Sequence, residues 1–187
     1  MREEATDREL MTRIAGQDQS ALRSLLGHHQ LRVYRFVLRI VRNEAVAEEL
    51  TNEVFLEVWR NAKVYEGRSA VGTWLLSIAH HRAVSTLRKR REASWDDDAA
   101  AELRDKSDDP ETTAQKANKS MLLRRVMEQL STEHRTIIDL VYYHEKSIVE
   151  VSEVLNIPVN TVKTRMFYAR KRLSELLQAA GVDRGWP

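Results

Sequence analysis

The chain has 187 residues, enough for one large domain or two small ones, and it contains no cysteine. Disulfides and thiolate metal sites are therefore excluded, which fits a reducing cytoplasm. The first residues are charged and amphipathic, and no apolar run reaches membrane-spanning length, so we expect a cytoplasmic protein without a membrane partner. Few Gly and Pro, with abundant Ala, Leu, Glu and Arg, predict an all-α fold.

Charge is segregated along the chain. Residues 1–91 hold 16 basic and 11 acidic side chains, residues 92–112 hold 2 and 9, and residues 113–187 hold 12 and 8. Two basic blocks that flank an acidic stretch suit a polyanionic partner touched at two places. We therefore predict two small helical domains, 1–92 and 113–187, joined by an acidic flexible linker over 93–112. A solvated tether and a segment that folds back over the basic surfaces both fit the linker's composition.

The first long helix is predicted over 21–42, where apolar residues recur every three or four positions. Asn43 is expected to cap the next helix, from Ala45 to Ala62. That helix directs an apolar set inward: Val46, Ala47, Leu50, Val54, Phe55 and Val58. Its acids lie on or beside one face: Glu48, Glu49, Glu53 and Glu57. Like charges at this spacing weaken an isolated helix, and both a solvated face and a docking face for a basic partner fit them.

A loop is predicted over 64–72, which contains Tyr65 and two glycines. Thr73 opens the next helix, which carries Trp74 and runs to four consecutive cations, Arg88, Lys89, Arg90 and Arg91. Cations suit the negative end of a helix dipole, but four in a row exceed what that end needs. Beside an aromatic-bearing loop they favour a nucleic-acid surface, with cations on phosphates and aromatics stacked on bases.

The third part of the chain begins with a helix from Asp109-Pro110 to about Leu130. Ser131 and Thr132 start another, whose predicted core stripe is Ile137, Ile138, Val141 and Tyr142. These two helices lead directly into the most informative segment of the sequence.

Ser147 to Leu177 reads as two helices with a tight break. Ser147 and Glu150 form a capping box for the first, and Asn156-Ile157-Pro158 stops it, because proline supplies no N–H. Asn160 is expected to cap the second, which turns an apolar stripe inward: Val162, Met166, Ala169, Leu173 and Leu176. Most of its cations remain outside: Lys163, Arg165, Arg170, Lys171 and Arg172. A helix-turn-helix with a basic second helix favours the DNA major groove over an ordinary α-hairpin.

Three motifs in fixed order give the chain a family resemblance: AEELTNEVFLEVW (47–59), SAVGTWLLSIA (69–79) and IPVNTVKTRMFYARKRL (157–173). Together they resemble bacterial RNA polymerase sigma factors of the extracytoplasmic-function (ECF) group, which hold only sigma regions 2 and 4. The resemblance covers residues 20–92 and 113–178. It implies a subunit without chemistry of its own that binds core RNA polymerase, through the β′ coiled coil and the β flap, and promoter DNA. An anti-sigma factor is the further partner it implies.

The resemblance also implies site residues. The polymerase-binding set is Glu49, Asn52, Glu53, Phe55 and Trp59. The set for the opened −10 strand is Tyr65, Ser69, Trp74, His81, Arg88, Lys89, Arg90 and Arg91. The set for the −35 duplex is Asn160, Thr161, Lys163, Thr164, Arg165, Tyr168, Arg170 and Arg172. His81 replaces the family asparagine of the base pocket, and Tyr168 stands where arginine is frequent, so the family's base preferences do not carry over.

Two other classes fit parts of the sequence. A stand-alone helix-turn-helix regulator accounts for the C-terminal part, but no ligand pocket or self-complementary apolar face is visible, and the basic Trp74 helix has no purpose in it. A helical metal-dependent hydrolase accounts for the histidines at 28, 29, 80 and 81. Neighbouring helical residues point about 100° apart, so joint ligation within a pair is awkward. We expect no metal and no cofactor.

Overall fold

The computed structural model of the chain describes residues 2–93 and 114–182. The linker predicted over 93–112 therefore lies outside the described residues, apart from Ala93, which is the last residue of a helix. The helix start predicted at Asp109-Pro110 also lies outside them. These ranges contain helices and no strand, which confirms the all-α prediction for them. None of the helices they contain combines the length and apolar character needed to cross a membrane. The described helices fall into two compact units, which are taken separately below.

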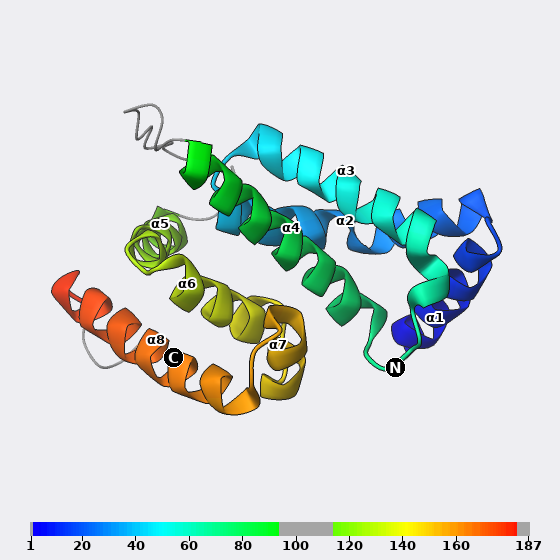
Figure 1. Cartoon of the computed structure of the whole chain (residues 1–187). Helices are drawn as coiled ribbons and strands as arrows, with labels where there is room; N and C mark the ends of the chain where they lie inside the picture. The colour runs from blue at the N-terminus through cyan, green and yellow to red at the C-terminus, as the bar shows by residue number, and fades with distance from the viewer. Residues whose placement is uncertain (1, 94–113, 183–187) are drawn as a thin grey trace. The chain divides into compact units, whose positions relative to one another are not determined.

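The N-terminal unit is built from five helical segments (Figure 1): α1 (Arg2–Ala15), α2 (Gln19–Val41), α3 (Glu44–Asn61), the 3₁₀ turn η1 (Ala62–Val64) and α4 (Val71–Ala93). α2 packs against α3 and α4, and α1 packs against α2 and η1. Leu25, Phe36, Val54 and Leu75 are among the fully or almost fully buried side chains between them. Each side chain of this size contributes about 1.5–3 kcal/mol when it leaves water. This core fixes the outward faces of α3 and α4.

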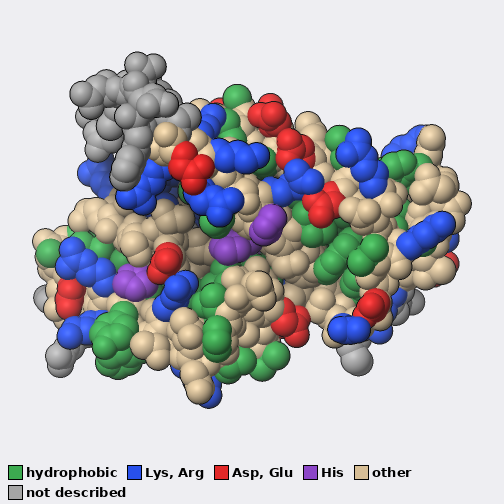
Figure 2. Space-filling model, viewed as in Figure 1, with side chains coloured by type: hydrophobic (Ala, Val, Ile, Leu, Met, Phe, Trp, Pro, Cys, Tyr) green, Lys and Arg blue, Asp and Glu red, His purple; other side chains and the backbone are tan. Residues whose placement is uncertain are grey.

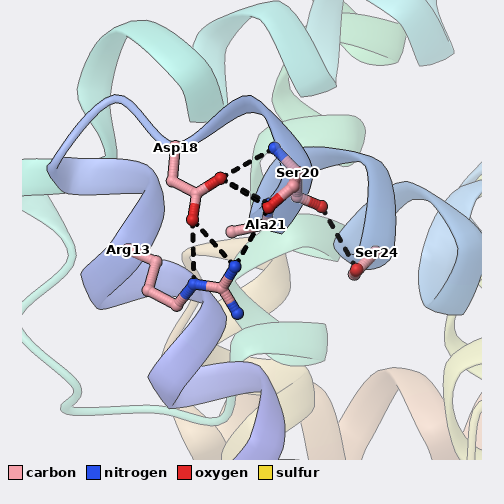
Figure 3. Close-up of polar contacts among 5 residues, drawn as sticks. All are labelled: Arg13, Asp18, Ser20, Ala21 and Ser24. Carbon is pink, nitrogen blue, oxygen red and sulfur yellow. Dashed lines mark hydrogen bonds and ion pairs between the residues drawn. The ribbon is translucent and has the colours of Figure 1, made fainter.

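A dense polar cap fixes the turn from α1 to α2 (Figure 3). Asp18 Oδ1 accepts hydrogen bonds from the Ser20 N–H at 2.8 Å, the Ser20 hydroxyl at 2.6 Å and the Ala21 N–H at 3.2 Å. Its Oδ2 accepts two from the Arg13 guanidinium, at 2.9 and 2.8 Å. The Ser20 hydroxyl, followed by Arg13 and the Ala21 N–H, holds the pKa of the Asp18 carboxyl well below its usual range. The carboxylate therefore stays ionised and keeps both helix ends joined.

The C-terminal unit contains α5 (Ala114–Glu128), α6 (Thr132–Ile138), the π-helical segment η2 (Asp139–Tyr143), most of α7 (Ile148–Leu155), and α8 (Val159–Ala179). α8 packs against α6 and α5. The predicted inward positions Val162, Met166 and Ala169 are buried, as is Ile137 of α6. The inward stripe of α8 is confirmed at four of its five positions, Leu176 included, and Leu173 is half-buried.

One position of the core stripe predicted at 137, 138, 141 and 142 is wrong. Ile137 and Ile138 are buried, but Tyr142 is 59% exposed. The backbone changes from α6 to the wider π-helical segment at Asp139, and the N–H of His144 bonds to the Asp139 carbonyl at 3.0 Å. A π-helical turn holds more residues than an α-helical turn, so the 3.6-residue pattern no longer places position 142 inward.

The junction of the helix-turn-helix follows local chemistry. Glu150 Oε2 accepts from the Ser147 N–H at 2.9 Å, and Ser147 Oγ accepts from the Glu150 N–H at 3.2 Å, which confirms the capping box. Asn156 has φ of 51°, a left-handed conformation that asparagine tolerates better than most residues. The predicted Asn160 cap is wrong, because α8 begins at Val159 after Pro158 and no side chain caps it. Proline at this position fixes the chain entering the helix without a side-chain acceptor.

Candidate nucleic-acid and partner interfaces

The outward face of α8 carries all eight residues predicted for duplex DNA. Six are exposed: Asn160, Lys163, Thr164, Tyr168, Arg170 and Arg172. Two are half-buried, Thr161 and Arg165. Asn160, Thr164 and Tyr168 project on the side opposite Val162, Met166 and Ala169, whereas Arg165 and Arg170 lie on the two flanks of that buried stripe. The predicted set thus occupies the outer side of α8 and its two edges.

The cations of this surface have neighbours inside the protein. Arg165 Nη2 lies 3.6 Å from Glu133 Oε2 of α6, and the guanidinium of Arg170 lies over the Tyr142 ring, 5.7 Å from its centroid. Arg172 pairs with Glu175 at 3.2 Å. Exposed pairs of this kind contribute little to stability and exchange readily for a phosphate or a base. Arg165 is therefore held in a defined position by a pair that a stronger acceptor can replace.

Phe167 is a candidate contact that the sequence argument missed. Its side chain is 64% exposed, and its ring lies 5.4 Å from that of Tyr168 in an edge-to-face arrangement. It also lines a shallow groove with Ile148 and Met166, beside Lys163 and Arg170. The helical spacing contained the signal, because an inward stripe at 162, 166 and 169 leaves position 167 outside.

The loop before α4 forms an aromatic corner. The Tyr65 hydroxyl donates to the Ser69 carbonyl at 2.6 Å, across the loop. The Tyr65 and Trp74 rings lie 5.2 Å apart and are tilted by 47°. Tyr65, Ser69 and Trp74 are all half-buried, so part of each of the two aromatic rings stays accessible. α4 begins at Val71, two residues earlier than predicted. A preformed pair of this kind suits the stacking of an unpaired base.

α4 extends this corner into a stripe along one helix face. Trp74, His81 and Arg88 are seven residues apart and lie on the same side, two turns from one to the next. His81, Arg88 and the following cations Lys89, Arg90 and Arg91 are exposed. The predicted −10 set is thus continuous from an aromatic start to a basic end.

The polymerase-binding set on α3 divides between surface and core. Glu49 and Asn52 are exposed, Glu53 and Trp59 are half-buried, and Phe55 is only 3% exposed. In this conformation Phe55 is a core residue that supports α3 from within and offers no surface for a partner. Figure 2 shows acidic side chains over the helix that Figure 1 labels α3.

Leu56 is the apolar member of the α3 face. It is 52% exposed, and it continues the line of Glu49 and Asn52 at helical spacing. Sequence reasoning missed it because apolar residues were assigned to the core. The sequence could have indicated it, because Leu56 lies between Asn52 and Trp59, which were both predicted to contact polymerase.

Arg82 of α4 reaches across to the acids of α3. Its Nη1 donates to Glu53 Oε2 at 2.5 Å, and its Nη2 and Nε donate to Glu57 Oε2 at 2.6 and 2.8 Å. Partial burial disfavours the charged guanidinium, but the hydrogen bonds and attraction from Glu57 and Glu53 outweigh it and raise the pKa of Arg82 above its ordinary value. The single positive charge of Arg82 is therefore shared by two of the four clustered acids, Glu53 and Glu57, and offsets one of their two negative charges. Glu48 and Glu49 are exposed and remain accessible to a partner.

Asp7 of α1 contacts both His28 and His29 of α2, at 2.9 and 2.6 Å. Among the described residues, this is the one group of three or more His, Cys, Asp or Glu side chains whose spacing allows a shared metal ion. His80 and His81, the other adjacent pair, do not belong to it. Sequence reasoning missed the cluster because Asp7 is brought to the histidines only by the packing of α1 on α2.

Comparisons with known proteins cover both units. The family models Sigma-70 region 2 and Sigma-70, region 4 match residues 25–93 and 120–173. The ECF RNA polymerase sigma factor SigK of Mycobacterium bovis (strain BCG / Pasteur 1173P2) is 33% identical over 177 residues, which cover 91% of this chain and 93% of the relative. SigK of Mycobacterium ulcerans (strain Agy99) is 32% identical over 174 residues, with the same coverage.

A solved structure has the same fold. The sigma factor RpoE from Bartonella quintana, in complex with the anti-sigma factor NepR, matches with a TM-score of 0.72 and 22% identity over 87% of this chain and 98% of that chain. The match to both sigma regions, and to relatives over nearly their whole length, confirms the resemblance read from the three motifs. The chain therefore belongs to the family of ECF RNA polymerase sigma factors.

Proposed function

We propose that this chain directs core RNA polymerase to promoters as an alternative sigma factor, with a separate surface for each of three tasks. One observation carries the assignment of the surfaces. Two outward faces that combine cations with aromatics lie on different units, and an acidic face with an exposed leucine lies on a third helix. A stand-alone helix-turn-helix regulator needs only the first of these, and family membership disfavours it.

The α8 face binds the −35 element as duplex. Lys163 and Arg172 contact phosphates, and Arg165 reaches a base edge after it leaves Glu133. Arginine pairs with guanine O6 and N7 through two hydrogen bonds, and such a pair is worth about 1–3 kcal/mol of discrimination. Phe167 and Tyr168 add apolar contact in the groove, where thymine methyl groups are exposed.

The aromatic corner of Tyr65 and Trp74 captures an unstacked base of the −10 strand, and the stripe through His81 and Arg88 holds the strand that follows. Extrusion of a base costs a few kcal/mol. Stacking returns about 1–3 kcal/mol per base, and phosphate contacts by the cations at the end of α4 add to it. Because Tyr65 is already fixed by Ser69, the corner needs no ordering when the base arrives.

The α3 face binds the β′ coiled coil of core polymerase through Glu49, Asn52 and Leu56, with Trp59 at its edge. Glu53 contributes through its pair with Arg82, and Phe55 supports the helix from the core. We place the β flap contact on the C-terminal unit. The chain acts in the cytoplasm, where core polymerase works, and it has no enzymatic activity of its own.

An anti-sigma factor is the further partner. RpoE was solved with NepR, and CnrH, a fold relative at a TM-score of 0.66, was solved with the cytosolic domain of CnrY. Family membership supports the same kind of control here. A partner that covers α3 and α8 blocks polymerase and duplex binding together.

Run-off transcription with purified core polymerase on a genomic fragment library tests the proposal. We expect discrete promoter-specific transcripts that depend on this chain. DNA binding without any gain in transcription contradicts it and supports the stand-alone regulator. In a binding titration with core polymerase, Glu49→Arg should lower the affinity by several kcal/mol, because it places like charges together at the interface. Glu9→Arg, on the exposed side of α1, is the matched control and should leave that affinity unchanged.

A further inference from the structure

A carboxylate and two imidazoles meet where α1 packs against α2. Asp7 Oδ1 lies 2.9 Å from His28 Nδ1, and Asp7 Oδ2 lies 2.6 Å from His29 Nε2. One donor atom from each residue lies within 4.8 Å of the other two. Asp7 is 4% exposed and His29 is 7% exposed, whereas His28 reaches the surface. The cluster therefore has a fixed inner side and an open outer side.

Adjacent helical residues ordinarily serve different sites, because their side chains diverge by about 100°. His28 and His29 converge because they present different ring nitrogens, Nδ1 of the first and Nε2 of the second. The carboxylate that they share comes from another helix and lies between them. Both imidazoles can therefore reach one ion, although adjacent helical residues point about 100° apart.

The donor set and spacing suit a metal ion. Two imidazoles and one carboxylate are ligands for Zn²⁺ and for other divalent first-row transition ions. Such ions hold nitrogen and oxygen at about 2.0–2.2 Å, so two donors around a tetrahedral ion are about 3.4 Å apart. The observed 2.9 and 2.6 Å, which run to different oxygens of Asp7, must open by about 0.5–0.8 Å, and His28 lies at the surface where its ring can turn. Solvent can reach the remaining coordination positions on the His28 side.

We propose that Asp7, His28 and His29 bind one divalent transition-metal ion, with water completing its coordination. Each ring nitrogen that binds the ion must be free of its proton, so a proton held on His28 Nδ1 or His29 Nε2 moves to the other nitrogen of that ring or is released to solvent. None of these three residues belongs to the proposed polymerase or promoter surfaces, so the metal site and the proposed function are tested separately.

The position of the site gives it a structural consequence. His29 Cε1 lies 3.6 Å from the place that a Cβ would take on Gly72, in the first turn of α4. A metal on His29 therefore ties α1 and α2 together directly behind the start of α4, just after the loop that carries Tyr65. Metal binding should stabilise this end of the N-terminal unit.

Metal uptake by the full chain tests the proposal. The protein is freed of any affinity tag, treated with chelator and dialysed, then titrated with Co²⁺ while its visible absorption is followed. We expect one equivalent to bind, to be displaced by Zn²⁺, and to raise the thermal midpoint of unfolding. No uptake of either ion at millimolar concentration overturns the proposal and leaves a hydrogen-bonded latch between α1 and α2.

Variants locate the site. Asp7→Asn and His28→Gln should each weaken binding by at least about tenfold. His81→Gln, which changes an exposed histidine on α4, should bind as the parent does. His28 lies at the surface, so His28→Gln decides the matter if Asp7→Asn fails to fold. Unchanged uptake in His28→Gln, or an equal loss in His81→Gln, overturns the assignment.

Discussion

The surfaces on α8 and on α4 both combine cations with aromatics, but they are built differently. On α8 the aromatics Phe167 and Tyr168 project into solvent, 64% and 53% exposed, and the cations are interleaved with them. On α4 the aromatic Trp74 is half-buried against Tyr65, and the run of cations from Arg88 to Arg91 begins about four turns later. One surface is a helix with projecting side chains, and the other is a fixed corner with a basic extension.

This difference fits the two forms of DNA proposed for the two surfaces. Duplex DNA keeps its bases stacked, so a reader must project into the groove and can adjust its side chains there. An opened strand offers the face of a base, which needs a rigid platform already in place. The composition of a surface therefore indicates nucleic acid, and the way its aromatics are held indicates which form of it.

Among changes to the two surfaces proposed for DNA, the largest effect is expected from removing the aromatic corner of Tyr65 and Trp74. Trp74→Ala should weaken binding of holoenzyme to a single-stranded −10 oligonucleotide by about 1–3 kcal/mol, roughly 5- to 150-fold, because stacking is lost. Tyr168→Ala is the matched change on α8 and should leave that affinity unchanged. Fluorescence anisotropy with a labelled oligonucleotide measures both. Equal losses in the two variants would remove the distinction between the surfaces.

Arg165→Ala tests the projecting surface. We expect a loss of about 1–3 kcal/mol in −35 binding that depends on the base pair opposite the side chain, because base-edge hydrogen bonds disappear. Competition between −35 duplexes that differ at single positions measures it. A loss of the same size for every sequence assigns Arg165 to a phosphate instead.

A smaller effect is expected from the neighbour of that arginine. Glu133→Gln releases Arg165 from its exposed ion pair and should strengthen −35 binding by up to about 1 kcal/mol. The gain should disappear when Arg165→Ala is already present, since the two residues act through one contact. An equal gain in both backgrounds shows instead that Glu133 repels the DNA directly.

The smallest effect is expected from the polar cap that Asp18 forms at the turn between α1 and α2. The lowered pKa of Asp18 means that its ionised form stabilises the folded state at neutral pH, and that this contribution is lost as the pH falls below the range in which the unfolded carboxyl takes up a proton. The stability difference between parent and Asp18→Asn should be constant from pH 7 to about 5 and should shrink below about 4. Urea unfolding at pH 7, 5 and 3 measures it. A difference that grows toward pH 3 contradicts the assignment.

Much of the fold could be predicted because it depends on local pattern. Apolar spacing placed Val54, Val58 and Val162 in the core, and all three are buried. Short-range hydrogen bonding placed the Asn43 cap, whose Oδ1 accepts from the Val46 N–H at 2.9 Å. Such features need no knowledge of distant residues, so the sequence alone contains them.

The rest depends on what spacing does not record. Tyr142 is exposed because the helix widens, and nothing in the 3.6-residue period indicates that change. Phe55 was carried over as a contact by resemblance, although its own apolar spacing placed it inside, and the spacing was right. Leu56 and Phe167 were overlooked because apolar side chains are usually assigned to the core. Asp7 meets its histidines only through tertiary packing.

The bridge from Arg82 to Glu53 and Glu57 has a consequence for protein engineering. A chimera that takes α3 from one sigma factor and α4 from another separates the guanidinium from its two carboxylates. The chimera then has either acids on α3 without their arginine or an arginine on α4 without its acceptors, and the charge of the α3 face proposed for polymerase changes although no residue of α3 was substituted. Exchanges between relatives should therefore move these three positions together.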